Sequence, residues 1–296
     1  MSARGGHVPS RQHGTALILV LWLIVLLTAL VGGFALAART ENLQARVLVR
    51  GLVASGAARA GLEYAVARIA QTDPRLQWRP DGRAYRWRYA DADVEVKVID
   101  ENGKLDLNQA DPVLLAALLQ GAGAEASQAA RLAAAIVDWR DSDPLTQPAG
   151  GAEDADYAAA NLPYGAKDAE FESVAELQQV LGMTPALYAR IAPHVTVYSG
   201  RVRPDPAFAS AQVLNALGMD GEQIVAQRRG PDALSPDGAP VAGMVGAGSG
   251  TYSIESRARL ADGRESLLRA VVRTGGGGLP GMAYVPLRWE EGASPR

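Results

Sequence analysis

The stretch that decides the fold is residues 14–38, GTALILVLWLIVLLTALVGGFALAA, which contains no charged residue. About 20 apolar residues suffice for a helix to span the hydrocarbon core of a bilayer. A secretory signal peptide has a shorter apolar core that ends in a small-x-small cleavage site, and no such site ends this stretch. The sequence therefore predicts one transmembrane helix at residues 15–38, which carries the rest of the chain.

A short basic leader precedes the apolar stretch. It contains Arg4 and Arg11 and stops at Gly14, where the apolar residues begin. Arginines also follow the stretch, so the distribution of positive charge does not set the orientation. The short leader and the large domain behind it favour a cytoplasmic N terminus in a single-pass protein. An uncleaved signal anchor is the alternative.

The leader resembles the class III leader of type IV pilins and pseudopilins, which a prepilin peptidase cuts after the glycine on the cytoplasmic side. This resemblance implies cleavage between Gly14 and Thr15, so that Leu19 takes mature position five. Most pilin-like subunits carry a glutamate there, which can pair with the amino terminus of a neighbour. An ionised carboxylate in a bilayer is costly without a partner. Leu19 is therefore what a filament-tip subunit should have.

Composition bounds what the rest of the chain can be. Its 296 residues, 48% hydrophobic and 21% charged, fit one or two globular domains beyond the anchor. The absence of cysteine excludes disulfides, thiolate catalysis and Cys-zinc sites. The net charge is −3, but residues 105–199 contain 13 acidic and four basic residues, which gives that segment −9. This asymmetry argues against nucleic-acid binding in the middle of the chain.

Two kinds of periodicity predict an α+β fold. Apolar or small residues recur at steps of three and four over residues 40–69, which predicts that the N-terminal helix continues beyond the membrane. Period-two alternation over residues 84–89 and 94–99 predicts one β-hairpin. Residues 251–260 and 266–273 flank an Asp-Gly turn and predict a second. We expect both hairpins in one antiparallel sheet packed on the long helix.

The segment between the hairpins is predicted to be helical. Asp111 and Pro112 form a helix start, and Ser173 and Glu176 have capping-box spacing. These two starts belong to the first two of three loosely repeated helix-hairpin-helix units, and the third covers residues 211–229. We therefore expect a large inserted all-α domain of helix-hairpin-helix or SAM-like type. The predicted parts are a leader at 1–14, the transmembrane helix at 15–38, a first pilin-like part at 39–104, the inserted helical domain at 105–230, a second pilin-like part at 231–274 and a flexible tail at 275–296.

An acidic loop in the insert is the best candidate metal site. Near-alternating carboxylates in a Gly/Pro-rich loop suit calcium, which takes about 6 to 8 oxygen ligands. The spacing is not that of an EF-hand, and solvated acids around a helix end are the alternative. Zinc is a poor fit because the sequence has three histidines and no cysteine. The predicted ligands are Asp138, Asp141, Asp143, Glu153, Asp154 and Asp156.

The absence of familiar catalytic motifs argues against an enzyme. The sequence contains no Gly-x-Ser-x-Gly elbow, no HExxH pair and no P-loop. A hydrolase that uses the acidic loop is the weakest hypothesis. A membrane-anchored helix-hairpin-helix DNA receptor of the competence type is the alternative function, although we expect no nucleic-acid binding from so acidic a segment.

Several stretches together resemble the K-type minor pseudopilins of bacterial type II secretion systems. They are residues 11–27, 106–110, 135–143, 151–157 and 171–183, with the Asp-Trp-Arg-Asp and Gly-Ala-Glu motifs as the most specific. The resemblance implies a pilin-like domain interrupted by a helical domain, and a structural calcium ion in the acidic loop. It also implies a periplasmic protein, anchored in the inner membrane, that assembles with I- and J-type minor pseudopilins and other pseudopilus subunits. Such a protein would initiate the pseudopilus at its tip and support export of folded proteins.

Overall fold

A computed structural model describes residues 13–230, 248–275 and 282–292. The chain divides into two compact units, Met1–Val53 and Ala54–Arg296. One helix, α1 (His13–Ile69), runs through the boundary between them and is 57 residues long. It is long and apolar enough to cross a membrane. The leader residues 1–12 lie outside the described residues, and the predicted cleavage point falls in the first turn of α1.

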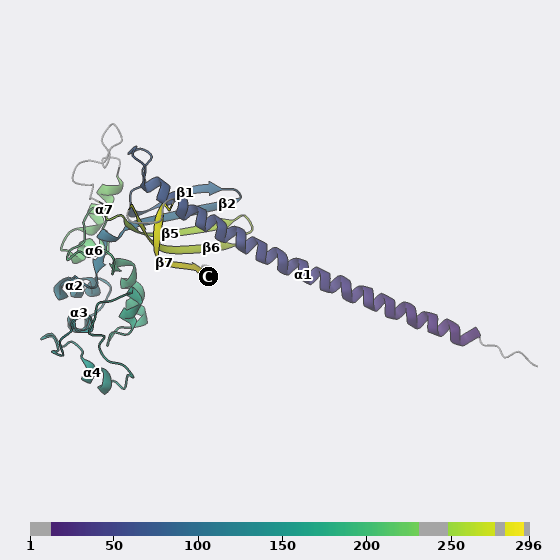
Figure 1. Cartoon of the computed structure of the whole chain (residues 1–296), viewed down its shortest axis with the longest axis horizontal. Helices are drawn as coiled ribbons and strands as arrows, with labels where there is room; N and C mark the ends of the chain where they lie inside the picture. The colour runs from purple at the N-terminus through teal and green to yellow at the C-terminus, as the bar shows by residue number, and fades with distance from the viewer. Residues whose placement is uncertain (1–12, 231–247, 276–281, 293–296) are drawn as a thin grey trace, which may run out of the picture. The chain divides into compact units, whose positions relative to one another are not determined.

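The last turns of α1 pack on a β-sheet, and small residues allow a close approach (Figure 1). Ala54, Ala58 and Ala65 are buried in this contact. A Cβ at Gly61 would overlap with Ser256 Oγ and lie 2.8 Å from Val94 Cγ1. The predicted face of small residues therefore seats the helix directly on the strands.

The sheet has five antiparallel strands in the order β1-β2-β5-β6-β7. The two predicted hairpins are confirmed as β1 (Asp81–Tyr89) with β2 (Ala92–Asp100), and β5 (Thr251–Leu260) with β6 (Glu265–Thr274). Gly263 in the Asp-Gly turn has a positive φ of 83°, a conformation that favours glycine. Strands β2 and β5 are adjacent, so a single sheet forms from segments that are far apart in the sequence.

The predicted flexible tail is wrong for part of its length. Residues Tyr284–Gly292 form β7, an edge strand that pairs with β6. Pro286 lies within it, and proline is accepted on an edge strand because one side of the strand needs no ladder hydrogen bond. Tyr284 Oη donates to Glu63 Oε1 at 2.7 Å, and the Arg59 guanidinium lies over the Trp289 ring, so β7 also contacts α1.

Helices dominate the chain between β2 and β5. In chain order the elements are η1 (Glu101–Gly103), β3 (Leu105–Asp106), α2 (Pro112–Gly121), α3 (Ala126–Arg140), α4 (Asp154–Ala159), η2 (Val174–Gln178), α5 (Pro185–Ile191), η3 (Ala192–His194), β4 (Val195–Thr196), α6 (Ala211–Ala216) and α7 (Gly221–Arg229). The Asp111 cap and the Ser173–Glu176 capping box are both present. The assignment to a helix-hairpin-helix or SAM-like type stays a prediction.

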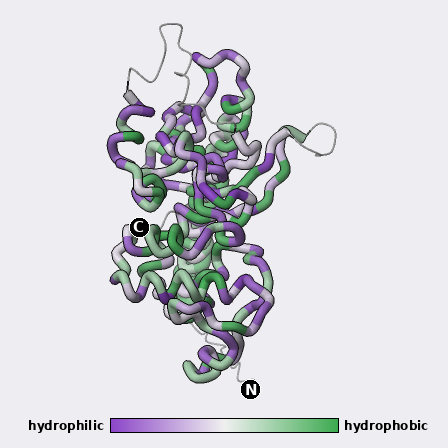
Figure 2. The backbone as a smooth tube through the Cα atoms, turned by 90° about the vertical axis from the view of Figure 1, so that its left-hand side faces the viewer, coloured by the Kyte–Doolittle hydropathy of each residue, from purple (hydrophilic) through white to green (hydrophobic). Residues whose placement is uncertain are grey.

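The described part of the chain has two hydrophobic cores. One core lies between α1 and the sheet, and the other lies within the helical segment around Leu115, Ile136 and Leu177. Short green and purple segments alternate along the backbone in Figure 2, as expected for elements that bury one face. The α+β architecture of a long helix on an antiparallel sheet, with a helical region inserted in it, is thus confirmed.

Candidate metal centre

The first half of the site is built by the end of α3. Asp138 lies in the last turn of this helix and is fully buried, and Asp141 is the C-cap residue. Arg140 fixes this end, because its guanidinium donates to the carbonyls of Leu107 and Ala110. The carboxylates of Asp138 and Asp141 therefore start from a rigid backbone.

The second half is the start of α4. Glu153 is its N-cap residue, and Asp156 completes a capping box by accepting from the Glu153 N–H at 3.0 Å. Glu153 is buried, with 8% of its surface exposed. The short helix thus holds the Glu153 carboxylate against the end of α3.

Asp138, Asp141 and Glu153 form one cluster. Each contributes one carboxylate oxygen, and these oxygens all lie within 4.8 Å of one another. Within the described residues, Asp141 Oδ1 and Glu153 Oε1 are buried and have no hydrogen-bond partner. An unpartnered buried carboxylate oxygen is costly. A cation bound among the three carboxylates would reduce this cost.

The pKa values of the three clustered carboxyl groups are consistent with this geometry. Burial raises the pKa of Glu153 to about 7, and the neighbouring Asp138 carboxylate adds to the shift. Burial likewise raises the pKa of Asp138 and of Asp141. Without a cation, the cluster therefore resists holding all its negative charges.

The loop residues 147 and 151 shape the cluster, although neither was predicted from the sequence as a site residue. Gln147 donates its backbone N–H to Asp138 Oδ1 at 3.2 Å and its side-chain amide to Asp141 Oδ2 at 3.3 Å. A Cβ at Gly151 would overlap with Asp138 Oδ2 and lie 2.7 Å from Asp138 Cγ. The backbone at residue 151 therefore passes directly against the carboxylate. The pair of glycines before Ala152 was the available sequence signal.

The other three predicted ligands have local hydrogen-bond partners. Asp143 is exposed and accepts from the Leu145 N–H at 3.0 Å, and Asp154 accepts from the Ala166 N–H at 3.1 Å. Asp156 caps α4 as described above. None of the three belongs to the cluster found among the described residues. Asp168 is a further nearby acid: its backbone has a φ of 52°, and its charge raises the pKa of Glu153 and Asp141.

Aromatic rings lie behind the cluster. Trp139 follows Asp138 and is buried, and its ring centroid lies 6.0 Å from that of Tyr157 and 6.2 Å from that of Phe171. These rings belong to the core of the helical segment. The site therefore has a rigid apolar back and a donor set made only of oxygen. Such a set suits a hard divalent cation.

Comparison with known proteins finds similarity to one family. Residues 95–200 match the model of the family described as "Type II secretion system (T2SS), protein K". Type II secretion system protein K of Klebsiella pneumoniae is 29% identical over an alignment of 209 residues, which covers 62% of this chain and 62% of the relative. The chain is therefore similar to the type II secretion system protein K family over this segment.

Two further relatives align over shorter segments. The protein of Pectobacterium carotovorum subsp. carotovorum is 31% identical over 121 residues, and that of Aeromonas hydrophila is 34% identical over 122 residues. Each alignment covers 38% of this chain and 37% of the relative. All these alignments thus span less than two thirds of the relatives' length. The three clustered carboxylates lie inside the segment that the family model matches.

A solved structure shares the fold. It is a chain in the crystal structure of the GspK-GspI-GspJ complex from the enterotoxigenic Escherichia coli type 2 secretion system. The TM-score is 0.58 and the identity 17%, and the match covers 85% of this chain and 100% of that one. The fold of most of this chain therefore occurs in a protein of known structure.

Proposed function

We propose that this chain is a minor pseudopilin of a type II secretion system. It acts as a non-enzymatic subunit at the tip of the pseudopilus, where it initiates filament assembly and supports export of folded proteins across the outer membrane. The observation that carries the proposal is the match of residues 95–200 to the protein K family, on a chain whose N-terminal helix can cross a membrane.

The membrane topology follows from this assignment. Prepilin peptidase removes residues 1–14, and the mature chain begins at Thr15. Helix α1 then anchors the protein in the inner membrane, with the pilin-like parts and the inserted helical domain, residues 105–230, in the periplasm. N-terminal sequencing of protein from cells with active prepilin peptidase tests this. A mature protein that retains residues 1–14 would contradict it.

The proposed partners are the I- and J-type minor pseudopilins and other pseudopilus subunits. The related solved structure is a complex of GspK with GspI and GspJ, which supports this choice. Co-purification of the full-length chain with I- and J-type subunits in detergent is the decisive test.

The variant Leu19→Glu tests the tip position, because it adds at mature position five the carboxylate that a tip subunit does not need. We expect Leu19→Glu to impair filament initiation, and unchanged initiation would contradict the tip position.

The metal centre binds calcium and acts structurally. Asp138, Asp141 and Glu153 supply carboxylate oxygens, and the loop backbone between α3 and α4 can supply carbonyls. Asp143, Asp154 and Asp156 stay weaker candidates because each has a local partner. Terbium offers a direct assay, since Trp139 lies next to a ligand and can sensitise its luminescence. Calcium should displace terbium, and Asp138→Asn should abolish the signal.

A DNA receptor is the less favoured function. In the hairpin α6–α7 the Arg228 guanidinium is buried and donates to the carbonyls of Pro206, Ala207 and Ala209. It is therefore occupied by the protein's own backbone and is not presented to phosphate. Salt-dependent binding of duplex DNA would revive this alternative.

A further inference from the structure

The two edges of the five-stranded sheet are held in different ways. At one edge, residues 90 and 91 connect β1 to its neighbour β2. The Trp87 ring of β1 stacks on Tyr64 of α1, with the ring centroids 4.5 Å apart. The Tyr85 ring of β1 stacks on the buried Trp78, with the centroids 4.2 Å apart. A tight turn and two aromatic stacks therefore fix β1.

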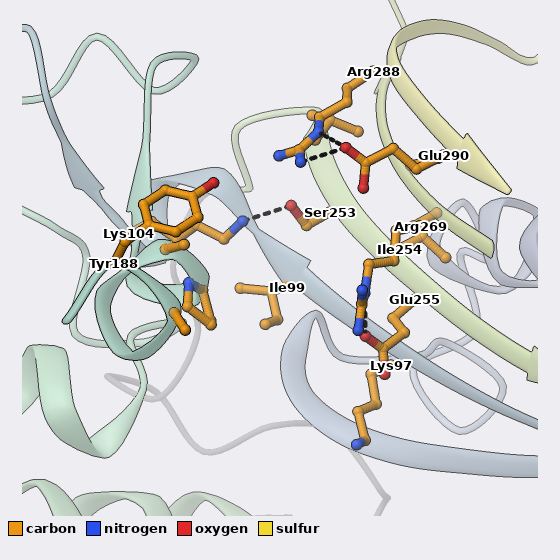
Figure 3. Close-up of a pocket in the computed structure, with 15 residues that line it drawn as sticks. Lys97, Ile99, Lys104, Tyr188, Ser253, Ile254, Glu255, Arg269, Arg288 and Glu290 are labelled. Carbon is orange, nitrogen blue, oxygen red and sulfur yellow. Dashed lines mark hydrogen bonds and ion pairs between the residues drawn. The ribbon is translucent and has the colours of Figure 1, made fainter. Parts of the chain in front are cut away.

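At the other edge, side chains tie β7 only weakly to its neighbour β6. Arg288 pairs with Glu290 within β7 (Figure 3). In the same view, Arg269 of β6 pairs with Glu255 of β5. Between the described residues of β6 and β7, no side-chain ion pair or hydrogen bond joins the two strands. Residues 275–283 connect them, whereas a loop of about two to five residues suffices for a β-hairpin.

The backbone pairing of β7 is interrupted near its middle. Val271 pairs with Arg288 and Val272 pairs with Pro286, so Leu287 has no partner in the register. Proline also has no N–H to donate to the ladder. The residues Tyr284–Gly292 are all intermediate or exposed, whereas most residues of β6 are buried. Opening of β7 should therefore cost less free energy than opening of the strands inside the sheet.

The β6 edge under β7 is a good template for another strand. Leu268 and Val272 face α1, and Leu267 and Val271 lie on the opposite face. Each of these four side chains is at most 6% exposed. A strand that is apolar on both faces and offers unpaired backbone N–H and C=O groups pairs readily with an added strand. The β6 edge therefore favours being covered whenever β7 leaves it.

We propose that β7 is an exchangeable strand, and that an extended strand of another polypeptide takes its place on the β6 edge. The incoming strand restores the backbone hydrogen bonds that β7 gives up, so no polar group is left unpaired. The occupant carries an aromatic residue at the position of Trp289, because the Arg59 guanidinium of α1 lies 5.7 Å from the centre of that ring. This interaction surface is separate from the metal centre, and it does not depend on the proposed position at a filament tip.

A peptide with the sequence of residues 284–292, YVPLRWEEG, tests strand exchange on the full-length chain in detergent. Arg269 and Glu290 lie opposite each other in the register, and the chain has no cysteine, so Arg269→Cys with Glu290→Cys creates one disulfide that locks β7 onto β6. We expect fluorescence anisotropy of the labelled peptide to show binding to the reduced double variant and at least about tenfold weaker binding after oxidation. A peptide with Trp289→Ala should bind at least about threefold more weakly than the original peptide.

Arg259→Cys with Glu265→Cys is the matched control, because its disulfide joins β5 to β6 and leaves β7 free. Its oxidation should leave peptide binding unchanged. Amide hydrogen exchange of the unmodified chain is a second measurement, in which β7 should exchange at least about 100-fold faster than β1, the other edge strand.

Three results would overturn the proposal: no peptide binding to the reduced variant, equal binding to its oxidised and reduced forms, or equal exchange of the two edge strands. Equal binding of a peptide with the same residues in scrambled order would also overturn it, because the peptide would then adhere without pairing as a strand.

Discussion

Calcium-free protein should lose stability as the pH rises from about 5 to about 8, and calcium should reverse this loss. The reason is the Glu153 carboxyl, whose pKa is raised from 4.5 to about 7 in the folded protein. A group with a raised folded-state pKa holds its proton more tightly when folded. Its stabilising contribution is complete below its ordinary pKa and is lost as the pH passes through the folded-state value. The raised pKa values of Asp138 and Asp141 act in the same direction.

The size of the effect follows from the same shift. The difference between 4.5 and about 7 corresponds to about 3 kcal/mol, at about 1.36 kcal/mol per pKa unit. The neighbouring Asp143 and Asp154 are exposed, so water near the cluster screens part of this, and we expect about 2 kcal/mol. Calcium at about 100 times its dissociation constant should add back about 2.7 kcal/mol.

Urea unfolding monitored by tryptophan fluorescence, with and without chelator at both pH values, measures these free energies. Glu153→Gln should abolish most of the pH dependence and weaken the calcium effect. Glu172→Gln is the matched control, because the Glu172 side chain is 86% exposed and lies in the same helical segment. If the chelated wild-type protein is equally stable at both pH values and calcium adds nothing, the carboxylates do not form the cluster described here.

Three further predictions concern the packing at Gly151 and Gly61 and the buried ion pair between Lys104 and Glu101. Gly151→Ala should abolish calcium stabilisation in a thermal shift assay, because its Cβ would overlap with Asp138 Oδ2, whereas Gly121→Ala, with nothing within 4 Å, should leave it intact. Gly61→Ala should lower the free energy of unfolding by about 1 to 3 kcal/mol through overpacking against Val94 and Ser256; Gly56→Ala in the same helix meets no atom within 4 Å and should be neutral or stabilising. Lys104→Met should cost about 3 to 5 kcal/mol in urea unfolding because it leaves the buried Glu101 without its cation, and the double variant with Glu101→Leu should recover part of that loss.

Hydrophobic periodicity and turn residues predicted most of the helices and strands, whereas the composition of the C-terminal segment concealed strand β7. Alternation identified the first hairpin, because its strands bury one face against α1, and the Asp262-Gly263 turn identified the second. Strand β7 was missed because glycines precede it and Pro286 interrupts it, both of which are typical of loops. The strand forms because Tyr284 and Trp289 contact α1, and no local pattern reports contacts with residues more than 200 positions away.

The acidic loop illustrates a different limit. Sequence spacing identified all three clustered carboxylates but could not separate them from Asp143, Asp154 and Asp156. Asp and Glu side chains near helix ends compete for nearby backbone N–H groups, so an acid in such a loop is either a cap or a ligand. Only the fold decides, since it brings the end of α3 to the start of α4 and leaves two buried oxygens without a partner.

The separation of the two cores determines how far the effect of the metal should reach. The cluster rests on the core of the helical segment, whereas α1 and the sheet share the other core. Between them, Glu101 accepts from Lys104, Ser253 and Thr196, which joins η1 to β5 and β4 by polar contacts. Loss of calcium should therefore loosen the loop between α3 and α4 and leave the sheet intact. Amide hydrogen exchange should then increase near Asp138 and Glu153 upon chelation, with β5 and β6 unchanged, and uniform loss of protection would show that the metal supports both cores.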